Sequence, residues 1–192
     1  IYTFVKGRPI SNSNKDQLNS LGKSIAHLHQ SGSNSDLYRK NMMLLPSWKH
    51  ITESFSKSNP KISSVEYEYI FENINHLQDK FPLNLRQINI HADLFKDNIF
   101  FKKDIVSGVI DFYFSCYDYF IYDIAIIVND WCFIKDDMLF NKLYFDKIIE
   151  GYNCERKLLD IELNSLNILL RAAAVRILVT RLHDYIFHPS DA

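Results

Sequence analysis

Three oxygen-bearing side chains have the types and the spacing that phosphoryl transfer requires. Asn98 lies five residues after Asp93, and Asp111 lies eighteen residues after it, near the end of an apolar run. This chemistry needs a carboxylate that accepts or orients the proton of the attacking hydroxyl, and oxygen ligands for the Mg²⁺ ion that bridges the phosphates. We therefore predict that Asp93 is the catalytic proton acceptor. Asn98 and Asp111 are predicted to bind the metal and, through it, the nucleotide.

Short apolar runs flank these residues and must position them. The runs are QINI (87–90), NIFF (98–101) and SGVIDF (107–112), and polar turns separate them, which is typical of short strands. A strand–loop–strand hairpin returns the end of one strand to the start of the other, so that the three side chains can converge. The sequence therefore predicts a small β-hairpin insert that carries the catalytic loop.

The rest of the chain has mostly helical patterns. Ser63 and Glu66 have the spacing of a capping box at the start of one helix, and the polar stretch 11–14 could cap another. Besides a short strand at 1–5, the predicted elements are helices at about 16–30, 47–56, 63–81, 119–132, 137–150, where Gly151 ends the helix, and 156–187. These patterns predict one α+β domain that is mostly helical.

Composition and charge exclude several classes of protein. The chain has 22 basic and 23 acidic residues, and its net charge of −1 argues against nucleic acid as a partner. The richest apolar stretch, 166–182, is interrupted by Arg171, Arg176 and Arg181, and no apolar run reaches the length of a membrane span. The three cysteines are widely separated and form no metal-binding pair. We expect a cytoplasmic protein that does not bind a membrane and whose cysteines are reduced.

The stretch 91–98 has the pattern H-x-D-x-x-x-x-N, followed by an aspartate on the next strand, as in the catalytic loop of kinases. It resembles the large lobe of small-molecule kinases of the aminoglycoside phosphotransferase and choline kinase superfamily. The sequence departs from protein kinases at Ala92, where they have arginine, and at Tyr113, where they have glycine. Asp123 in YDIA is similar to a structural aspartate of the small-molecule branch.

Four longer blocks narrow the resemblance to bacterial homoserine kinases. They are residues 90–133, residues 171–187, the opening YTFVKGR (2–8) and LGKSIAHLHQSG (21–32). The resemblance implies a protein-kinase-like fold and an enzyme that depends on ATP and Mg²⁺. Such an enzyme transfers the γ-phosphate of ATP to the side-chain hydroxyl of L-homoserine, a step in threonine biosynthesis.

The resemblance also implies a division of the chain into parts. Residues 1–10 would be the remnant of the hinge between two lobes, where Tyr2 and Phe4 meet the adenine. Residues 11–192 would be the helical large lobe, with its C-terminal tail truncated. The small N-terminal lobe, which carries a phosphate-covering loop and a lysine–glutamate pair, is absent from this sequence. We therefore expect a fragment with weak activity or none by itself, and nothing in the sequence indicates its oligomeric state.

An amino-acid substrate such as L-homoserine needs partners for two charged groups. Its carboxylate suits an arginine, and its ammonium suits a carboxylate or an aromatic face. Arg176 is the first candidate for the carboxylate, although it could equally form an internal ion pair with an acid such as Asp184. Tyr113, Asp130 and Trp131 are further candidates for substrate binding.

Several neighbouring residues are given supporting roles. His91 is predicted to hold the catalytic loop through hydrogen bonds, and Asp123 is predicted to be a buried hydrogen-bond acceptor. Asp97 is expected to be solvated. Arg39 with Asn41 is a weaker candidate for substrate binding.

Three other functions fit parts of the sequence. The first is another small-alcohol kinase, acting on choline, ethanolamine or an aminoglycoside, and an acidic, aromatic pocket would favour choline. The second is a metal-dependent phosphohydrolase with His91, Asp93 and Asp111 as direct ligands, although such sites usually recruit several histidines. The third is a non-catalytic remnant that no longer binds ATP.

Overall fold

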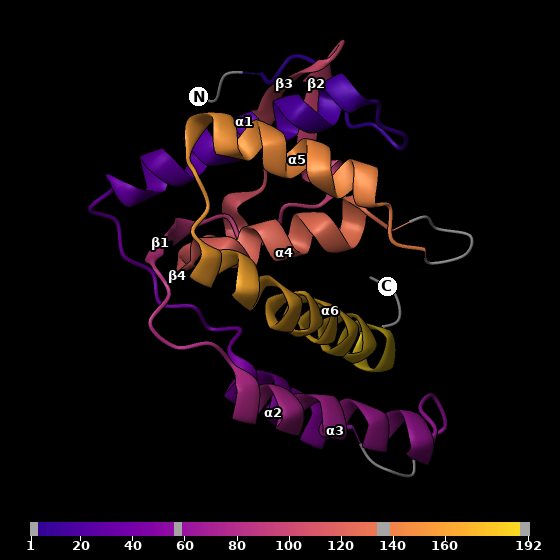
Figure 1. The fold of residues 1–192 in the computed structure, drawn as a ribbon. Coiled ribbons are helices and arrows are strands. Elements are labelled where there is room, and N and C mark those ends of the chain that lie inside the picture. Colours follow the sequence, from indigo (N-terminus) through magenta and orange to yellow (C-terminus); the bar gives the residue numbers. More distant parts are fainter. Residues whose placement is uncertain (1–3, 56–58, 134–138, 189–192) are drawn as a thin grey trace.

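The chain folds into stacked layers of helices with two small sheets. The computed structural model describes residues 4–55, 59–133 and 139–188. In chain order the elements are α1 (Lys15–Ser33), α2 (Leu45–Ser54), α3 (Ser64–Lys80), β1 (Gln87–Ile90), η1 (Lys96–Asn98), β2 (Ile99–Lys102), β3 (Ile105–Val109), η2 (Phe112–Phe114), β4 (Cys116–Tyr119), α4 (Phe120–Trp131), α5 (Lys142–Glu155) and α6 (Asp160–Phe187). Figure 1 shows α1 with α5 at one end, α4 and α6 in the middle, and α2 with α3 at the other end. The prediction of a mostly helical α+β domain is confirmed.

Helix α4 lies at the centre of the fold because it is apolar on all sides. Every residue from Phe120 to Val128 is buried, and Asp123 is the only carboxylate in this run. Helix α6 and strand β1 both pack against α4. A carboxylate in such a position needs hydrogen-bond donors, and these donors determine where the catalytic loop lies.

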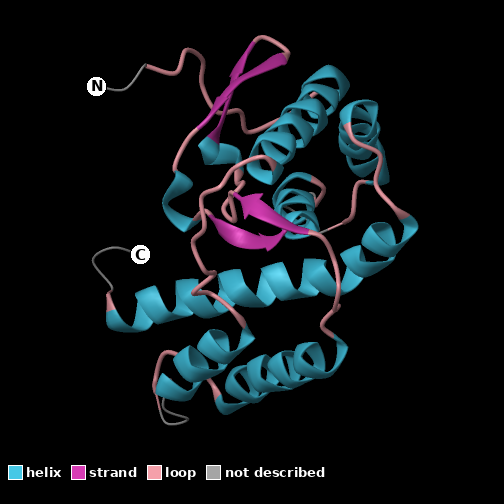
Figure 2. Ribbon diagram, turned by 90° about the vertical axis from the view of Figure 1, so that its left-hand side faces the viewer, coloured by secondary structure: helices cyan, strands magenta, loops and turns pink. Residues whose placement is uncertain are grey.

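Each of the two sheets consists of two antiparallel strands. β1 pairs with β4, so that Ile90 lies opposite Cys116, and β2 pairs with β3 in a hairpin that projects from the helices (Figure 2). The three strands predicted from the sequence are confirmed as β1, β2 and β3. The apolar pattern at 107–112 extends too far, because β3 ends at Val109 and Asp111 has a left-handed backbone with φ 61°. Sequence pattern gives no indication of β4.

The N-terminal segment lies along the β2–β3 hairpin. The N–H of Arg8 donates to the carbonyl of Phe101 at 3.1 Å, and the N–H of Phe101 donates to the carbonyl of Arg8 at 2.9 Å. The predicted strand at 1–5 is wrong for its two described residues, which have no strand structure. Tyr2 lies outside the described residues, and the Phe4 side chain is 85% exposed.

Helices α1 and α5 lie very close together because each has a glycine at the contact. A Cβ atom on Gly22 would lie 2.0 Å from the carbonyl oxygen of Ile148, and one on Gly151 would lie 2.1 Å from that of Asn19. Gly151 therefore lies inside α5, and the prediction that it ends this helix is wrong. Asn14 caps the start of α1, as the polar stretch before the helix predicts.

Helices α2 and α3 form a pair that packs against α6. The predicted capping box of Ser63 and Glu66 is confirmed at the start of α3, where each side chain accepts a hydrogen bond from the backbone N–H of the other residue. Among the described helices, α6 alone is long and apolar enough to cross a membrane by length and composition. In this fold α6 lies between α4 and the α2–α3 pair (Figure 2).

Candidate active site

The start of the predicted catalytic loop, residues 91–98, is held by a buried carboxylate on α4. Oδ2 of Asp123 accepts the N–H of His91 at 2.8 Å, and Oδ1 accepts the N–H of Ala92 at 2.7 Å. Nε2 of His29, from α1, lies 3.2 Å from the same Oδ2, and both side chains are almost completely buried. These contacts hold Ala92 in a left-handed conformation with φ 64°, which a residue with a side chain rarely adopts.

The His91 ring connects the catalytic loop to the segment that follows β3. Nε2 lies 2.9 Å from the carbonyl oxygen of Ile110, and Nδ1 accepts the N–H of Asp93 at 3.2 Å. Since a carbonyl only accepts, the proton of the neutral ring is on Nε2. The ring also packs against Phe112, with the ring centroids 4.5 Å apart. Both ring nitrogens are thus occupied, and neither is available to a metal ion.

Asp93 is partly buried and has a partner on each side-chain oxygen. Nη2 of Arg176 donates to Oδ1 at 3.0 Å. Nδ2 of Asn98 donates to the backbone carbonyl of Asp93 at 2.8 Å and to Oδ2 at 3.3 Å. Burial raises the pKa of Asp93, the Arg176 guanidinium opposes this rise, and the charge of Asp111 adds to it. A carboxylate with a raised pKa is a better proton acceptor, provided that it is ionised.

Asp111 lies within reach of the same site. The N–H of Ile110 donates to the carbonyl of Asn98 at 3.0 Å, so Asp111 follows directly after a hydrogen bond between the two segments. Its carboxylate accepts the N–H of Tyr113 at 3.4 Å and is otherwise exposed. The fold thus brings Asp93, Asn98 and Asp111 together.

The residues present fit a magnesium ion better than a metal that needs several protein ligands. No group of three or more His, Cys, Asp or Glu side chains suited to a metal occurs in the described parts of the chain. Because Nδ2 of Asn98 is directed at two oxygens of Asp93, its Oδ1 is available as a ligand, together with the Asp111 carboxylate. Mg²⁺ takes few protein ligands and completes its shell with phosphates and water.

Arg176 is committed to the catalytic loop. It is 5% exposed, its Nη1 donates to the carbonyl of Ala92, and its Nη2 contacts Asp93. The guanidinium also lies 5.4 Å from the centroid of the Phe114 ring. Arg176 forms its ion pair with Asp93 and not with Asp184. The Asp184 carboxylate instead lies 3.3 Å from the ring of His183.

Three other candidate substrate residues form hydrogen bonds that do not include Asp93. Tyr113 is 71% exposed in the loop after Asp111, and its carbonyl accepts a hydrogen bond from Arg39. The Arg39 guanidinium also lies 5.7 Å from the centroid of the Tyr113 ring. Asn41 donates to the Asp118 carboxylate at 2.5 Å. Arg39 is therefore engaged by Tyr113, and Asn41 by Asp118.

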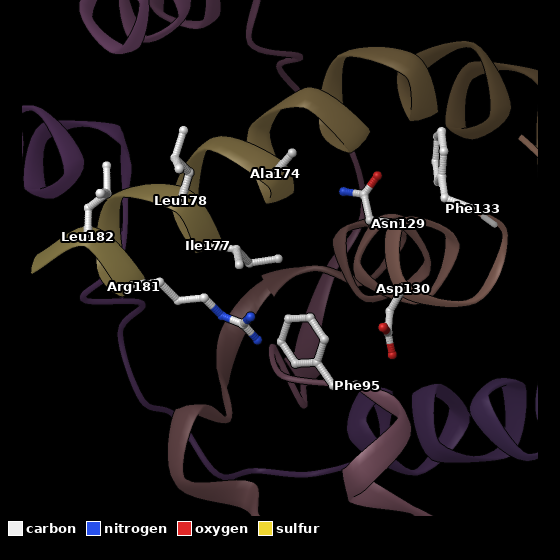
Figure 3. A pocket seen from close by; sticks show the side chains of 9 residues that line it. All are labelled: Phe95, Asn129, Asp130, Phe133, Ala174, Ile177, Leu178, Arg181 and Leu182. Atoms are coloured by element: carbon white, nitrogen blue, oxygen red, sulfur yellow. The ribbon is translucent and has the colours of Figure 1, made fainter. Parts of the chain in front are cut away.

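A cavity of 680 Å³ lies beside the catalytic loop, between α4 and α6 (Figure 3). It is lined by Phe95, Asn129, Asp130, Phe133, Ala174, Ile177, Leu178, Arg181 and Leu182. Of the predicted substrate residues only Asp130 lines it, and its Oδ2 accepts the N–H of Lys96 at 2.8 Å. Trp131 is 1% exposed and packs against Phe101, with the ring centroids 5.9 Å apart.

Sequence reasoning missed three residues around this site: His29, Phe95 and Arg181. His29 lies in the conspicuous block 21–32, but nothing local shows that its ring reaches Asp123. Phe95 lies two residues after Asp93, a position that could have drawn attention. Arg181 is one of three regularly spaced arginines on α6, and only the packing of that helix distinguishes it from the others.

Solved structures have the same fold at low sequence identity. An amicoumacin kinase in complex with AMP-PNP and Ca²⁺ has a TM-score of 0.75 and 19% identity, over 98% of this chain and 58% of that chain. An ethanolamine kinase of Plasmodium vivax has a TM-score of 0.75 and 16% identity, over 97% of this chain and 61% of that chain. At these identities the likeness shows a kinase-like fold and nothing finer.

Sequence comparison gives nearer relatives. The chain is 36% identical over 192 residues to a homoserine kinase of Bartonella tribocorum, covering 100% of this chain and 60% of the relative. It is 36% identical over 195 residues to a homoserine kinase of Brucella melitensis biotype 2, covering 100% of this chain and 59% of the relative. The chain thus spans about 60% of the length of these curated relatives. Residues 1–156 match the phosphotransferase enzyme family. The chain therefore belongs to the phosphotransferase enzyme family.

Proposed function

We propose that this chain carries the catalytic loop of an ATP-dependent kinase that phosphorylates the side-chain hydroxyl of L-homoserine. The observation that carries the proposal is that Asn98 donates to two oxygens of Asp93, while the N–H of Ile110, the residue before Asp111, donates to the carbonyl of Asn98. The names of the relatives that match the whole chain support homoserine as the acceptor. The proposal keeps the cytoplasmic location and the role in threonine synthesis that the resemblance implies.

In this proposal Asp93 orients the acceptor hydroxyl and takes its proton. The hydroxyl oxygen forms a bond to the γ-phosphorus of ATP, the bond from that phosphorus to the β,γ-bridging oxygen breaks, and ADP leaves. Asn98 and Asp111 would hold Mg²⁺, which when bound offsets the negative charge of the phosphates. Arg176 keeps the Asp93 carboxylate oriented and opposes the rise in its pKa that burial causes.

The proposed division of the chain follows the same resemblance. Residues 11–192 would be the large lobe of the kinase, and residues 1–10 would connect it to the nucleotide. The exposed ring of Phe4 is available for contact with an adenine. The same role for Tyr2 stays a prediction.

Two observations favour this proposal over two of the other functions, a metal-dependent phosphohydrolase and a non-catalytic remnant. A phosphohydrolase that used His91 as a metal ligand would need a free ring nitrogen, and both nitrogens of His91 are occupied. A non-catalytic remnant would have no need of an aspartate whose oxygens are held by Arg176 and Asn98.

The proposal is tested by measuring phosphate transfer from ATP to L-homoserine in the full natural chain, with ³¹P NMR to identify the phosphorylated product. Asp93→Asn should lower kcat by about 10²- to 10⁴-fold, because the proton acceptor is lost. Asp97→Asn is the matched control, since Asp97 belongs to the same loop and is exposed. An Asp93→Asn enzyme that is as active as the control, or a wild-type protein that phosphorylates no small alcohol, would contradict the proposal.

A further inference from the structure

The cavity beside the catalytic loop is lined by Arg181, whose guanidinium contacts an aromatic ring. Arg181 extends from α6 toward Phe95, and its Cζ lies 5.9 Å from the centroid of that ring (Figure 3). None of the described residues forms a hydrogen bond or an ion pair with its guanidinium, which lies in an exposed part of the helix. A free guanidinium presents a planar fork of donors that matches a carboxylate.

An acid lies in the wall of the same cavity. Asp130 is at the C-terminal end of α4 and uses Oδ2 to accept the N–H of Lys96. Among the described residues nothing donates to its Oδ1, so this oxygen is available to a ligand. Figure 3 shows the Arg181 guanidinium and the Asp130 carboxylate on either side of the Phe95 ring. The cavity thus offers one positive and one negative group across an aromatic side chain.

Phe95 connects the cavity with the loop that carries Asp93. It lies two residues after Asp93, and its N–H donates to the Asp93 carbonyl at 2.9 Å. A ligand whose charged groups meet Arg181 and Asp130 therefore lies against a residue that is hydrogen-bonded to the backbone of the proposed proton acceptor. Apart from Asn129, the remaining wall, which includes Ile177 and Leu178, is apolar and suits a short aliphatic chain.

The three arginines of α6 have three different environments. A step of five residues turns a helix by roughly 140°, so Arg171, Arg176 and Arg181 point in different directions. Arg171 lines a separate cavity with Tyr69 and Asn73. Arg176 has both Nη atoms engaged by the catalytic loop. Of the three, only Arg181 lines the cavity beside Phe95 and forms no hydrogen bond or ion pair with a described residue.

We propose that Arg181 binds the carboxylate of the acceptor substrate and that Asp130 binds its ammonium, so that the cavity selects an α-amino acid with a side-chain hydroxyl. This inference rests on the proposed kinase activity and assigns the recognition of the zwitterion to these two residues. It replaces Arg176, the candidate that the sequence favours, because that side chain is held by Asp93 and Ala92.

The test compares three acceptors in the full natural chain. They are L-homoserine, 3-aminopropan-1-ol, which lacks only the carboxylate, and 4-hydroxybutanoate, which lacks only the ammonium. Arg181→Gln should raise the KM for L-homoserine by about 10- to 100-fold, the range expected for losing hydrogen bonds to a charged group. The same variant should leave kcat/KM for 3-aminopropan-1-ol unchanged. Arg171→Gln, the matched control on the same helix, should change neither value.

Asp130→Asn tests the proposed recognition of the ammonium. The asparagine keeps an oxygen for the N–H of Lys96, so the loop retains its support. This variant should raise the KM for L-homoserine and leave kcat/KM for 4-hydroxybutanoate unchanged. Calorimetric titration with L-homoserine in the absence of ATP gives a readout that does not depend on turnover.

The outcomes separate the two proposals. If the wild-type protein phosphorylates none of the three acceptors but binds L-homoserine in an Arg181-dependent way, the kinase proposal fails and the binding assignment survives. If the protein is a kinase, but Arg181→Gln leaves the KM for L-homoserine unchanged or weakens all acceptors equally, the recognition assignment is overturned. A wild-type preference for 3-aminopropan-1-ol over L-homoserine would overturn it as well.

Discussion

The catalytic loop and the cavity beside it use charged groups in opposite ways. Around the loop, Asp123 of α4 accepts two backbone N–H groups and contacts His29. Arg176 of α6 donates hydrogen bonds to both Ala92 and Asp93. In the cavity, the guanidinium of Arg181 and one oxygen of Asp130 are unpaired among the described residues. Charges that are paired and buried fix the position of a backbone, whereas unpaired charges at a cavity wall are available to a ligand.

Two arginines on one helix show this difference most directly. Arg176 and Arg181 lie five residues apart on α6, and both approach the segment that follows β1. Arg176 is 5% exposed and satisfies a backbone carbonyl and a carboxylate. Among the described residues, Arg181 contacts the Phe95 ring and forms no hydrogen bond or ion pair. The first therefore positions Asp93, and in the proposed function the second recognises the acceptor substrate.

The largest effect on stability is expected from Asp123→Ala. This change leaves the N–H groups of His91 and Ala92 and the His29 ring without their acceptor inside the core. Removing one partner from a buried charged network costs about 3–5 kcal/mol of the free energy of unfolding. Urea denaturation of the variant and the wild type measures this difference.

The same substitution in the cavity wall provides the control. Asp130→Ala removes a carboxylate that holds a single backbone N–H near the surface, and it should lower the free energy of unfolding by about 1 kcal/mol. Equal losses for Asp123→Ala and Asp130→Ala would show that the two regions do not differ in the proposed way.

A smaller effect is expected from Arg176→Ala, and it should appear in kcat rather than in the KM for the acceptor. Losing the contacts to Ala92 and Asp93 misplaces the proton acceptor, for which we expect a loss of about 10²-fold in kcat. Burial already raises the pKa of Asp93, and Arg176 opposes that rise. Without the guanidinium the pKa of Asp93 rises further, so the acidic limb of the pH–rate profile should move to higher pH.

Arg176→Lys sharpens this experiment. A lysine keeps the positive charge but cannot form both contacts with the same geometry. Its acidic limb should therefore stay nearer to that of the wild type while kcat still falls. If Arg176→Ala raised only the KM for L-homoserine, Arg176 would belong to the recognition site and the contrast with Arg181 would be lost.

The smallest effect is expected at Asp118, on β4, an acid outside both regions. Burial raises the pKa of Asp118, although a hydrogen bond from Asn41 opposes the rise. Because the folded state then binds the proton more tightly than the unfolded state, this group favours folding below its ordinary pKa of 3.8 and loses that contribution as pH rises. Asp118→Asn removes the titration. Relative to the wild type, the variant should gain stability with rising pH, and urea midpoints that change in parallel would contradict this.

Much of the helical structure could be predicted because its causes are local. The capping box of Ser63 and Glu66 and the cap at Asn14 depend on residues three positions apart. Elements that depend on distant partners could not be predicted in this way. β4 forms by pairing with residues 87–90, which are distant in the sequence. Gly151 lies inside α5, where the absence of a side chain lets α1 approach closely.

The sequence by itself determined which residues could carry the chemistry. Asp93 and Asn98 lie in one short loop, where spacing alone fixes their relation, and Asp111 follows two residues after the second strand of the hairpin. Only the tertiary structure decided which residues surround them. The contact of Arg176 with Asp93 spans 83 residues of sequence, and that of His29 with Asp123 spans 94. Such contacts depend on how helices pack, because the direction in which a side chain points is fixed by the neighbours of its helix and not by the residues beside it in the chain.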